Sequence, residues 1–147
     1  SMESTHPRGA LSLQEAAAIA TRRSFYEVRA AHSLDTKMWA SQNSTAWTVI
    51  FETDARFQTS CLNRFVYVKS VLNLEEALHA AEPVRENIST VGLASTGVHA
   101  SAYAERFARW GATRICPLGQ MQNPPLTWRH DGRPALGDLV MWSEWEK

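Results

Sequence analysis

The stretch from Trp128 to Arg133, with the sequence WRHDGR, holds the side chains of this protein best suited to chemistry. A carboxylate next to a histidine, as at Asp131 and His130, can orient the imidazole for hydrogen bonding or proton transfer. The arginines can hold a phosphate or carboxylate group. In a purely structural alternative, Asp131 caps a turn and pairs with Arg133. Gly132 then supplies a positive φ angle, and His130 bonds to nearby backbone. The stretch by itself leaves both interpretations open.

Length and charge restrict what kind of protein this is. The 147 residues are enough for one domain with a hydrophobic core. Lys and Arg total 15, as do Asp and Glu, and the zero net charge without any basic run excludes nucleic acid as a partner. No apolar stretch approaches the roughly 20 residues that cross a bilayer, and the N-terminus lacks a signal segment. We therefore expect a cytoplasmic protein without a membrane span.

The sequence pattern predicts a leader over residues 1–10 and a single α/β domain over residues 11–147. Capping signatures at Ser12 and Asn73 mark two helix starts, and runs of β-branched and aromatic residues mark strands. The predicted helices span about 12–30, 74–81 and 99–110, and the predicted strands about 46–52, 65–71, 90–94 and 113–116. The segment 32–45 is polar and is expected to be a connection.

Strands that alternate with helices predict crossover connections, and therefore a mainly parallel sheet with flanking helices that contains all four strands. Ligands of such sheets collect at the carboxyl ends of the strands. This rule points to the turns after Val71, Ala94 and Cys116. The third turn leads into the WRHDGR stretch, so position and composition agree on a candidate functional loop.

Cys61 and Cys116 are far apart in the sequence and match no metal-site spacing or disulfide framework. Neither has a neighbouring His or helix N-terminus in the sequence that would activate its thiol. We therefore expect two reduced, partly buried thiols with packing roles rather than catalytic ones, and we expect no metal site.

Two long runs of the sequence carry a family resemblance. They are NRFVYVKSVLNLEEALHAAEPVRENISTVGLAS, residues 63–95, and ERFARWGATRICPLGQMQNPPLTWRHDGRPALGDLVMW, residues 105–142. The most specific markers are Thr90-Val91-Gly92-Leu93, the segment 111–117, and HDGR followed by Leu139, Val140 and Trp142. Together they resemble the C-terminal portion of LuxC-type acyl-CoA reductases, a divergent branch of the aldehyde dehydrogenase superfamily.

The resemblance implies a fold like the C-terminal part of an aldehyde dehydrogenase-like catalytic domain. It also implies a reaction, in which an acyl group passes from a thioester to an enzyme cysteine and is reduced by NADPH to a fatty aldehyde. In this family the nucleophilic cysteine and the dinucleotide-binding domain lie upstream of the region resembled, and this sequence has no Gly-rich phosphate-binding turn. We therefore expect NADPH in the complete enzyme but none on this chain alone. The chain is then either the C-terminal half of a reductase or a shorter protein derived from one.

The resemblance also suggests roles for individual residues. His130 and Asp131 are expected to support catalysis beside the acyl-cysteine, where a neutral imidazole donates to the developing oxyanion. Arg133 and Trp128 are expected at the substrate or the cofactor phosphate, and Trp128 either walls an acyl tunnel or anchors the core. Arg64 lies where relatives bring residues to the cofactor, although an ordinary surface arginine has the same sequence signature.

The alternative function is a non-catalytic docking or oligomerisation module that binds an upstream reductase domain or another subunit. Six tryptophans are many for the core of so short a chain, and aromatic residues are enriched where protein surfaces meet. The C-terminal segment LVMWSEWEK, residues 139–147, is the part expected to pack on another subunit. The enzyme interpretation instead predicts an acyl-CoA or acyl-carrier thioester as the partner.

Overall fold

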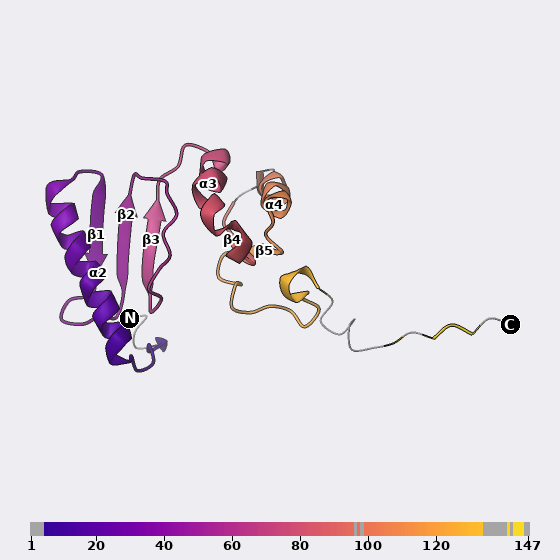
Figure 1. Cartoon of the computed structure of the whole chain (residues 1–147), viewed down its shortest axis with the longest axis horizontal. Helices are drawn as coiled ribbons and strands as arrows, with labels where there is room; N and C mark the ends of the chain where they lie inside the picture. Colours follow the sequence, from indigo (N-terminus) through magenta and orange to yellow (C-terminus); the bar gives the residue numbers. More distant parts are fainter. Residues whose placement is uncertain (1–4, 96, 98, 134–140, 142, 146–147) are drawn as a thin grey trace. The chain divides into compact units, whose positions relative to one another are not determined.

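The computed structural model describes residues 5–95, 97, 99–133, 141 and 143–145. The chain divides into two compact units, unit 1 (Ser1–Ala80) and unit 2 (Ala81–Lys147). Both contain helices and strands (Figure 1), which confirms the α/β class. The single-domain expectation stays a prediction, because compactness does not tell whether two units unfold together. Across the described part of the chain, no helix has the length and apolar character needed to cross a membrane.

Unit 1 begins with the helix α2 (Leu13–His32), which confirms the predicted helix at 12–30. The capping box is present, since the Ser12 hydroxyl accepts from the Glu15 backbone N–H at 3.2 Å and a Glu15 carboxylate oxygen accepts from the Ser12 backbone N–H at 2.8 Å. Ile19 and Tyr26 are its buried residues and lie two turns apart on one face. The sequence therefore determines both where this helix starts and which face packs inward.

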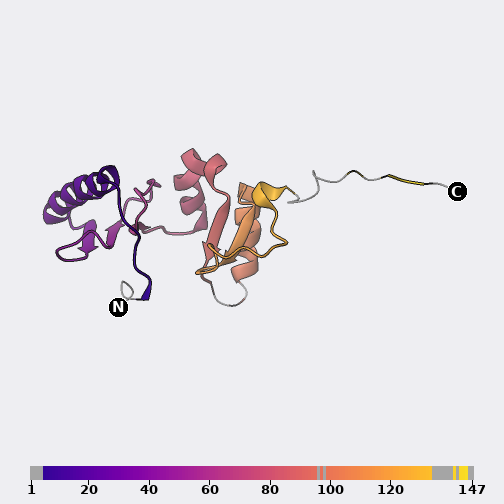
Figure 2. The ribbon, with the colours of Figure 1, turned by 90° about the horizontal axis from the view of Figure 1, so that it is seen from below.

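The sheet of unit 1 contains β1 (Thr36–Ala40), β2 (Thr48–Glu52) and β3 (Phe65–Lys69), in that order. β2 and β3 are parallel, whereas β1 is antiparallel to β2. Figures 1 and 2 show α2 lying along one face of the sheet. Ile19 and Tyr26 pack there against Ile50 and Phe65 to form the core. β1 falls within the segment expected to be a polar connection, so this part of the prediction is wrong: the short run TKMWA is surrounded by polar residues, and antiparallel pairing with β2 makes it a strand.

The two faces of this sheet differ because side chains alternate along each strand. Thr48, Ile50 and Glu52 point toward α2 and are buried. On the opposite face, the side chains of Trp39, Val66 and Val68 are 50%, 49% and 43% exposed. Trp39 pairs with Val49, which pairs in turn with Val66, so these apolar residues form a continuous patch. We call it the open face of unit 1.

Three consecutive residues before β3 have left-handed backbone conformations. The φ angles of Leu62, Asn63 and Arg64 are 64°, 53° and 63°. Such a conformation costs roughly 1 kcal/mol or more for a residue with a Cβ. Hydrogen bonds hold the turn, since the Phe65 N–H donates to the Leu62 carbonyl and the Thr48 N–H to the Arg64 carbonyl, both at 3.0 Å.

The helix α3 (Leu74–Ala81) matches the prediction, and the Asn73 side chain accepts from the Glu76 N–H at 3.0 Å. A 3₁₀ helix, η1 (Glu82–Asn87), continues from it with Pro83 in its first turn. This change of helix type at the proline follows from the missing N–H and the clash with the preceding turn.

Unit 2 is a strand–helix–strand motif. It consists of β4 (Thr90–Leu93), α4 (His99–Trp110) and β5 (Arg114–Pro117), and the two strands are parallel. α4 packs against both strands (Figure 2). Trp110 is buried and its indole N–H donates to Glu82 at 2.9 Å, which ties α4 to η1. The two predicted strands and the predicted helix at 99–110 are confirmed.

The prediction of one sheet containing all the strands is wrong. In the described residues, β3 belongs to the three-stranded sheet of unit 1 and β4 to the two-stranded sheet of unit 2. The parallel pairs β2–β3 and β4–β5 are confirmed, but the antiparallel β1 makes the first sheet mixed. Alternation of strands and helices in a sequence predicts that neighbouring strands run parallel. The hydrophobic pattern does not specify which strands pair with one another in one sheet.

Candidate functional site

Four of the five residues expected at the functional site lie together in unit 2. Trp128 precedes a short 3₁₀ turn, η2 (His130–Gly132), and Arg133 follows it. His130 and Asp131 are 72% and 58% exposed, and Asp131 Oδ2 lies 2.9 Å from His130 Nδ1. At this distance the two side chains form an ion pair when the imidazole is protonated, and the role expected for Asp131 in orienting His130 stays a prediction.

The turn depends on two left-handed residues in succession. Asp131 has a φ angle of 49° and Gly132 one of 76°. The positive φ of Gly132 was expected and that of Asp131 was not, although Asp tolerates this conformation better than most residues. The Arg133 N–H donates to the His130 carbonyl at 3.0 Å and closes the turn, while its side chain is exposed.

The loop between β5 and this turn covers one face of the β4–β5 sheet. A Cβ on Gly92 would lie 2.5 Å from the sulfur of Met121 and 3.3 Å from Leu118, so the loop approaches the strand too closely for a side chain. Gly92 pairs with Cys116, and side chains alternate, so Cys116 and Arg114 belong to this same face. This explains why a glycine stands inside the Thr90–Leu93 strand.

A hollow of about 590 Å³ lies between β5 and this loop. Its polar lining residues include Arg114, Gln120, Asn123, Thr127 and Trp128. A second hollow of about 380 Å³ lies at the carboxyl ends of β4 and β5, beside the first turn of α4. Only the second hollow is at the carboxyl edge where the sequence predicts ligands, whereas the first runs along β5 from Arg114 to Pro117; Cys116 borders both.

The remaining expected residues have ordinary surroundings. Trp128 is partly buried, and its ring centre lies 4.8 Å from that of His130. Arg64 belongs to unit 1, where its side chain donates to the His6 carbonyl. Cys61 is partly buried and packs on the core of unit 1. The packing role expected for Cys61 agrees with this position, whereas the one expected for Cys116, which borders the two hollows, stays a prediction.

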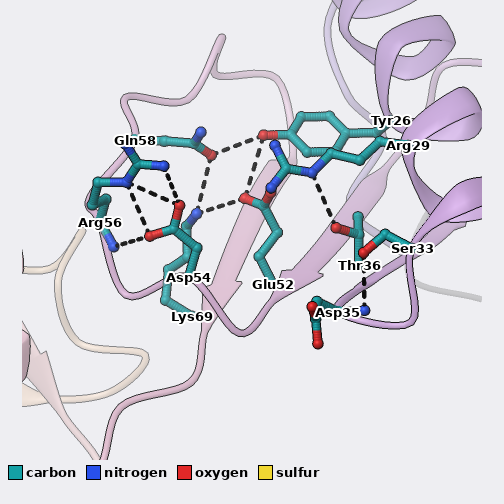
Figure 3. Close-up of polar contacts among 10 residues, drawn as sticks. All are labelled: Tyr26, Arg29, Ser33, Asp35, Thr36, Glu52, Asp54, Arg56, Gln58 and Lys69. Atoms are coloured by element: carbon teal, nitrogen blue, oxygen red, sulfur yellow. Dashed lines mark hydrogen bonds and ion pairs between the residues drawn. The ribbon is translucent and has the colours of Figure 1, made fainter.

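Unit 1 contains a buried ion cluster that the sequence analysis did not identify (Figure 3). The side chain of Glu52 is 2% exposed, and its carboxylate lies 2.5 Å from Lys69 Nζ and 3.2 Å from an Arg29 guanidinium nitrogen. The Tyr26 hydroxyl donates to Gln58 at 2.8 Å and lies 3.4 Å from Glu52. Lys69 also donates to Gln58 at 3.2 Å. Each charge in the cluster therefore has partners inside it.

Two pKa shifts accompany this cluster. Hydrogen bonds from the Arg56 side chain and backbone hold the pKa of Asp54 well below its usual range. Burial, with the neighbouring phenol of Tyr67 and the carboxylate of Glu52, raises the pKa of Tyr26, so this hydroxyl remains a hydrogen-bond donor.

The alternation of inward and outward side chains along β2 and β3 indicates where this cluster forms. Glu52 lies two and four residues after the buried Ile50 and Thr48, so it occupies an inward position of β2. Lys69 is in the same phase as Phe65 and pairs directly with Glu52 in the parallel ladder. A carboxylate and an ammonium at inward positions of neighbouring strands predict a buried pair, but only once their pairing is known.

Comparison with known proteins identifies the family. A family model described as acyl-CoA reductase (LuxC) matches residues 1–142. No curated protein and no solved structure matches the chain. The family match covers nearly the whole chain and includes the HDGR loop, the Gly92 strand and the Glu52 cluster. The chain therefore belongs to the LuxC family of acyl-CoA reductases.

Proposed function

We propose that this chain is part of a fatty acyl-CoA reductase that produces an aldehyde with NADPH. In this proposal the nucleophilic cysteine and the dinucleotide-binding domain lie outside the chain, and the fold is related to that of aldehyde dehydrogenases. The expected cytoplasmic location belongs to the same proposal. Family membership supports it. The observation that carries the role of this chain is the His130–Asp131 pair, at 2.9 Å in an exposed turn of the loop that follows β5; this turn lies beside Thr113 at the amino end of the strand, not at the carboxyl end that the sequence predicted.

The geometry of this pair refines the expected role of the histidine. When Nδ1 donates to Asp131, the neutral imidazole has a lone pair on Nε2 and accepts a proton there. Only the protonated ring donates from Nε2. His130 is therefore better suited to proton transfer than to neutral donation toward an oxyanion, and Asp131 stabilises the imidazolium that forms.

This assignment gives a balanced reaction. His130 takes the proton of the nucleophilic thiol as the thiolate attacks the acyl thioester, and it returns that proton to the departing CoA or carrier thiolate. NADPH supplies the hydride that reduces the acyl group. The aldehyde leaves as its bond to the enzyme sulfur breaks, and one proton from solvent restores the thiol. Overall, acyl thioester, NADPH and a proton give aldehyde, free thiol and NADP⁺.

Substitutions in a complete reductase that carries this segment test the proposal. We expect His130→Ala and Asp131→Ala each to lower acyl-thioester reduction at least tenfold, which corresponds to about 1.4 kcal/mol of transition-state stabilisation. Thermal stability should be unchanged in His130→Ala, because the side chain is exposed, and slightly lower in Asp131→Ala, because alanine tolerates the positive φ angle of this position less well than aspartate. Gln122→Ala, an exposed residue of the preceding loop, is the matched control and should retain its activity. Near wild-type turnover in both variants, or stability lost in proportion to activity, would contradict the proposal.

A docking module is the second candidate function, and the open face of unit 1 favours it. Parallel strands are normally covered on both sides, yet Trp39, Val66 and Val68 are about half exposed opposite α2. The partner proposed for this face is an upstream segment of the same reductase. Val66→Lys with Val68→Lys should abolish co-purification of that segment while leaving this chain folded. A compact monomer that binds no apolar dye would count against the module.

A further inference from the structure

Arg114 is a buried cation with an unusual set of partners. It is the first residue of β5 and is only 9% exposed. Its guanidinium donates to the backbone carbonyls of Met121 and Gln120, both at 2.8 Å, and of Asn123 at 3.4 Å. A buried charge is costly unless it is well hydrogen-bonded. Arg114 therefore keeps these hydrogen bonds only while the loop after β5 stays packed against the strand.

The contacts of Arg114 continue as far as the catalytic pair proposed above. The centre of its guanidinium lies 5.6 Å from the ring centre of Trp128, within the range of a cation–π interaction. The Trp128 ring lies 4.8 Å from the His130 ring, at an interplanar angle of 55°. His130 in turn contacts Asp131. A continuous series of contacts thus joins the strand to the imidazole.

Thr113, the residue just before β5, contacts the same loop at a second point. A Cβ on Gly132 would lie 3.5 Å from the Thr113 methyl group, so the turn rests directly on Thr113. The Thr113 hydroxyl donates to the Ser89 carbonyl at 3.1 Å, which fixes this side chain against β4. The loop therefore contacts Arg114 before His130 and Thr113 after it, two consecutive residues where β5 begins.

We propose that Arg114 is the positioning residue of the His130–Asp131 pair. It acts through the loop carbonyls and the Trp128 ring and does not touch the substrate. The inference rests on the proposed function for its effect on turnover, but its effect on the loop is independent of that function. A positioning residue holds a catalytic group in its productive geometry, so its loss lowers kcat more than it changes KM.

Two measurements on the same variants test this inference. In the full 147-residue chain, proton NMR should show a nuclear Overhauser effect between the Trp128 and His130 rings. Arg114→Met should abolish it and Arg114→Lys should weaken it. In a complete reductase, Arg114→Met should lower kcat at least tenfold with KM within twofold, and Arg114→Lys should fall between this variant and the wild type. Arg109→Met removes an exposed arginine of α4 and should change neither result.

A second variant covers the case in which Arg114→Met does not fold. Trp128→Leu leaves Arg114 bonded to the loop carbonyls but interrupts the contact with His130, and it should also lower kcat tenfold in a folded protein. Folded Arg114→Met that keeps the ring contact and full turnover would overturn the inference, as would full turnover of Trp128→Leu. If His130→Ala keeps full turnover, the proposed function fails. Loss of the ring contact in Arg114→Met would still establish that Arg114 positions the loop.

Discussion

The carboxyl ends of the two parallel strand pairs are used in different ways. At the end of β2 and β3, Glu52 and Lys69 pair directly, and Arg29, Tyr26 and Gln58 surround them. At the end of β4 and β5 there is a hollow bordered by Cys116, and an exposed loop follows β5. The first edge is closed by charges that satisfy one another, whereas the second leaves polar groups accessible to another molecule.

This difference shows the limit of the rule that ligands collect at carboxyl edges of sheets. The rule identifies both edges of this protein. It does not separate an edge closed by its own side chains from one that can receive a ligand. The separation comes from burial and pairing: Glu52 is 2% exposed and paired with Lys69, whereas the carboxyl ends of β4 and β5 border a hollow. We therefore assign a structural role to the unit 1 edge and a functional role to the unit 2 edge.

The largest effect is expected where the closed edge loses a charge. Lys69→Met leaves Glu52 without the cation that lies 2.5 Å away. We expect the free energy of unfolding to fall by about 3 kcal/mol, because a buried charge that loses its partner is strongly destabilising. Urea denaturation followed by circular dichroism measures it. The control Arg109→Met breaks an exposed pair with Glu105 and should cost less than about 0.5 kcal/mol.

Adding Glu52→Gln to Lys69→Met should recover at least half of the loss, since the buried carboxylate that lost Lys69 is removed, and Arg29, which then loses Glu52, is 39% exposed to solvent. Hydrogen exchange then tests the single-domain prediction. If the units unfold together, Lys69→Met lowers amide protection in β4 and β5 as well as in β2. A loss confined to unit 1 would show two independent domains. A cost below about 1 kcal/mol for Lys69→Met would remove the structural role assigned to the cluster.

A smaller effect is expected in unit 2, where the loop after β5 approaches Gly92. Gly92→Ala places a Cβ 2.5 Å from the Met121 sulfur, and Met121 must move aside. We expect a loss of about 1 kcal/mol, at the low end for overpacking because a methionine side chain is flexible. In a Met121→Ala background the same substitution should be close to neutral. Equal costs in both backgrounds would mean that strand propensity, rather than the loop contact, determines the effect.

The free energy of unfolding should also depend weakly on pH, through Asp54 of unit 1. The folded-state pKa of Asp54 is lowered, chiefly by its hydrogen bonds with Arg56, so the unfolded chain binds more protons below the usual Asp pKa of about 4. The stabilisation is present above that pH and is lost as the pH falls through the folded-state pKa. Asp54→Asn should therefore flatten the decline of unfolding free energy below about pH 4, measured by urea titration. Arg56→Gln should flatten it equally, and an unchanged slope in both would contradict the assignment.

No effect is expected from the cofactor on this chain alone. The sequence lacks a Gly-rich phosphate-binding turn, so calorimetry should detect no saturable binding of NADPH. Micromolar affinity would instead support the hypothesis that this chain is a complete enzyme by itself.

The sequence predicts local structure here better than it predicts assembly. The capping box at Ser12, the cap at Asn73 and the period of α4 are local signals, and their helices were predicted within a few residues. β1 and the division into two sheets depend on pairing between distant segments, for which the period of one segment contains no information. The His130–Asp131 contact was predictable because the residues are adjacent. The contacts of Glu52 and Arg114 required the pairing of strands and the path of a loop.

The left-handed turn at Leu62–Arg64 has a consequence for insertions and deletions. Side chains alternate along β3. The number of residues in the turn therefore determines whether Phe65 and Lys69 or Val66 and Val68 face α2. Deleting one residue of the turn would place the ammonium of Lys69 on the opposite side of the sheet from Glu52. A flexible connection would allow such slippage, whereas three constrained residues do not. The strained turn therefore acts as a fixed spacer, and insertions or deletions within it should be poorly tolerated.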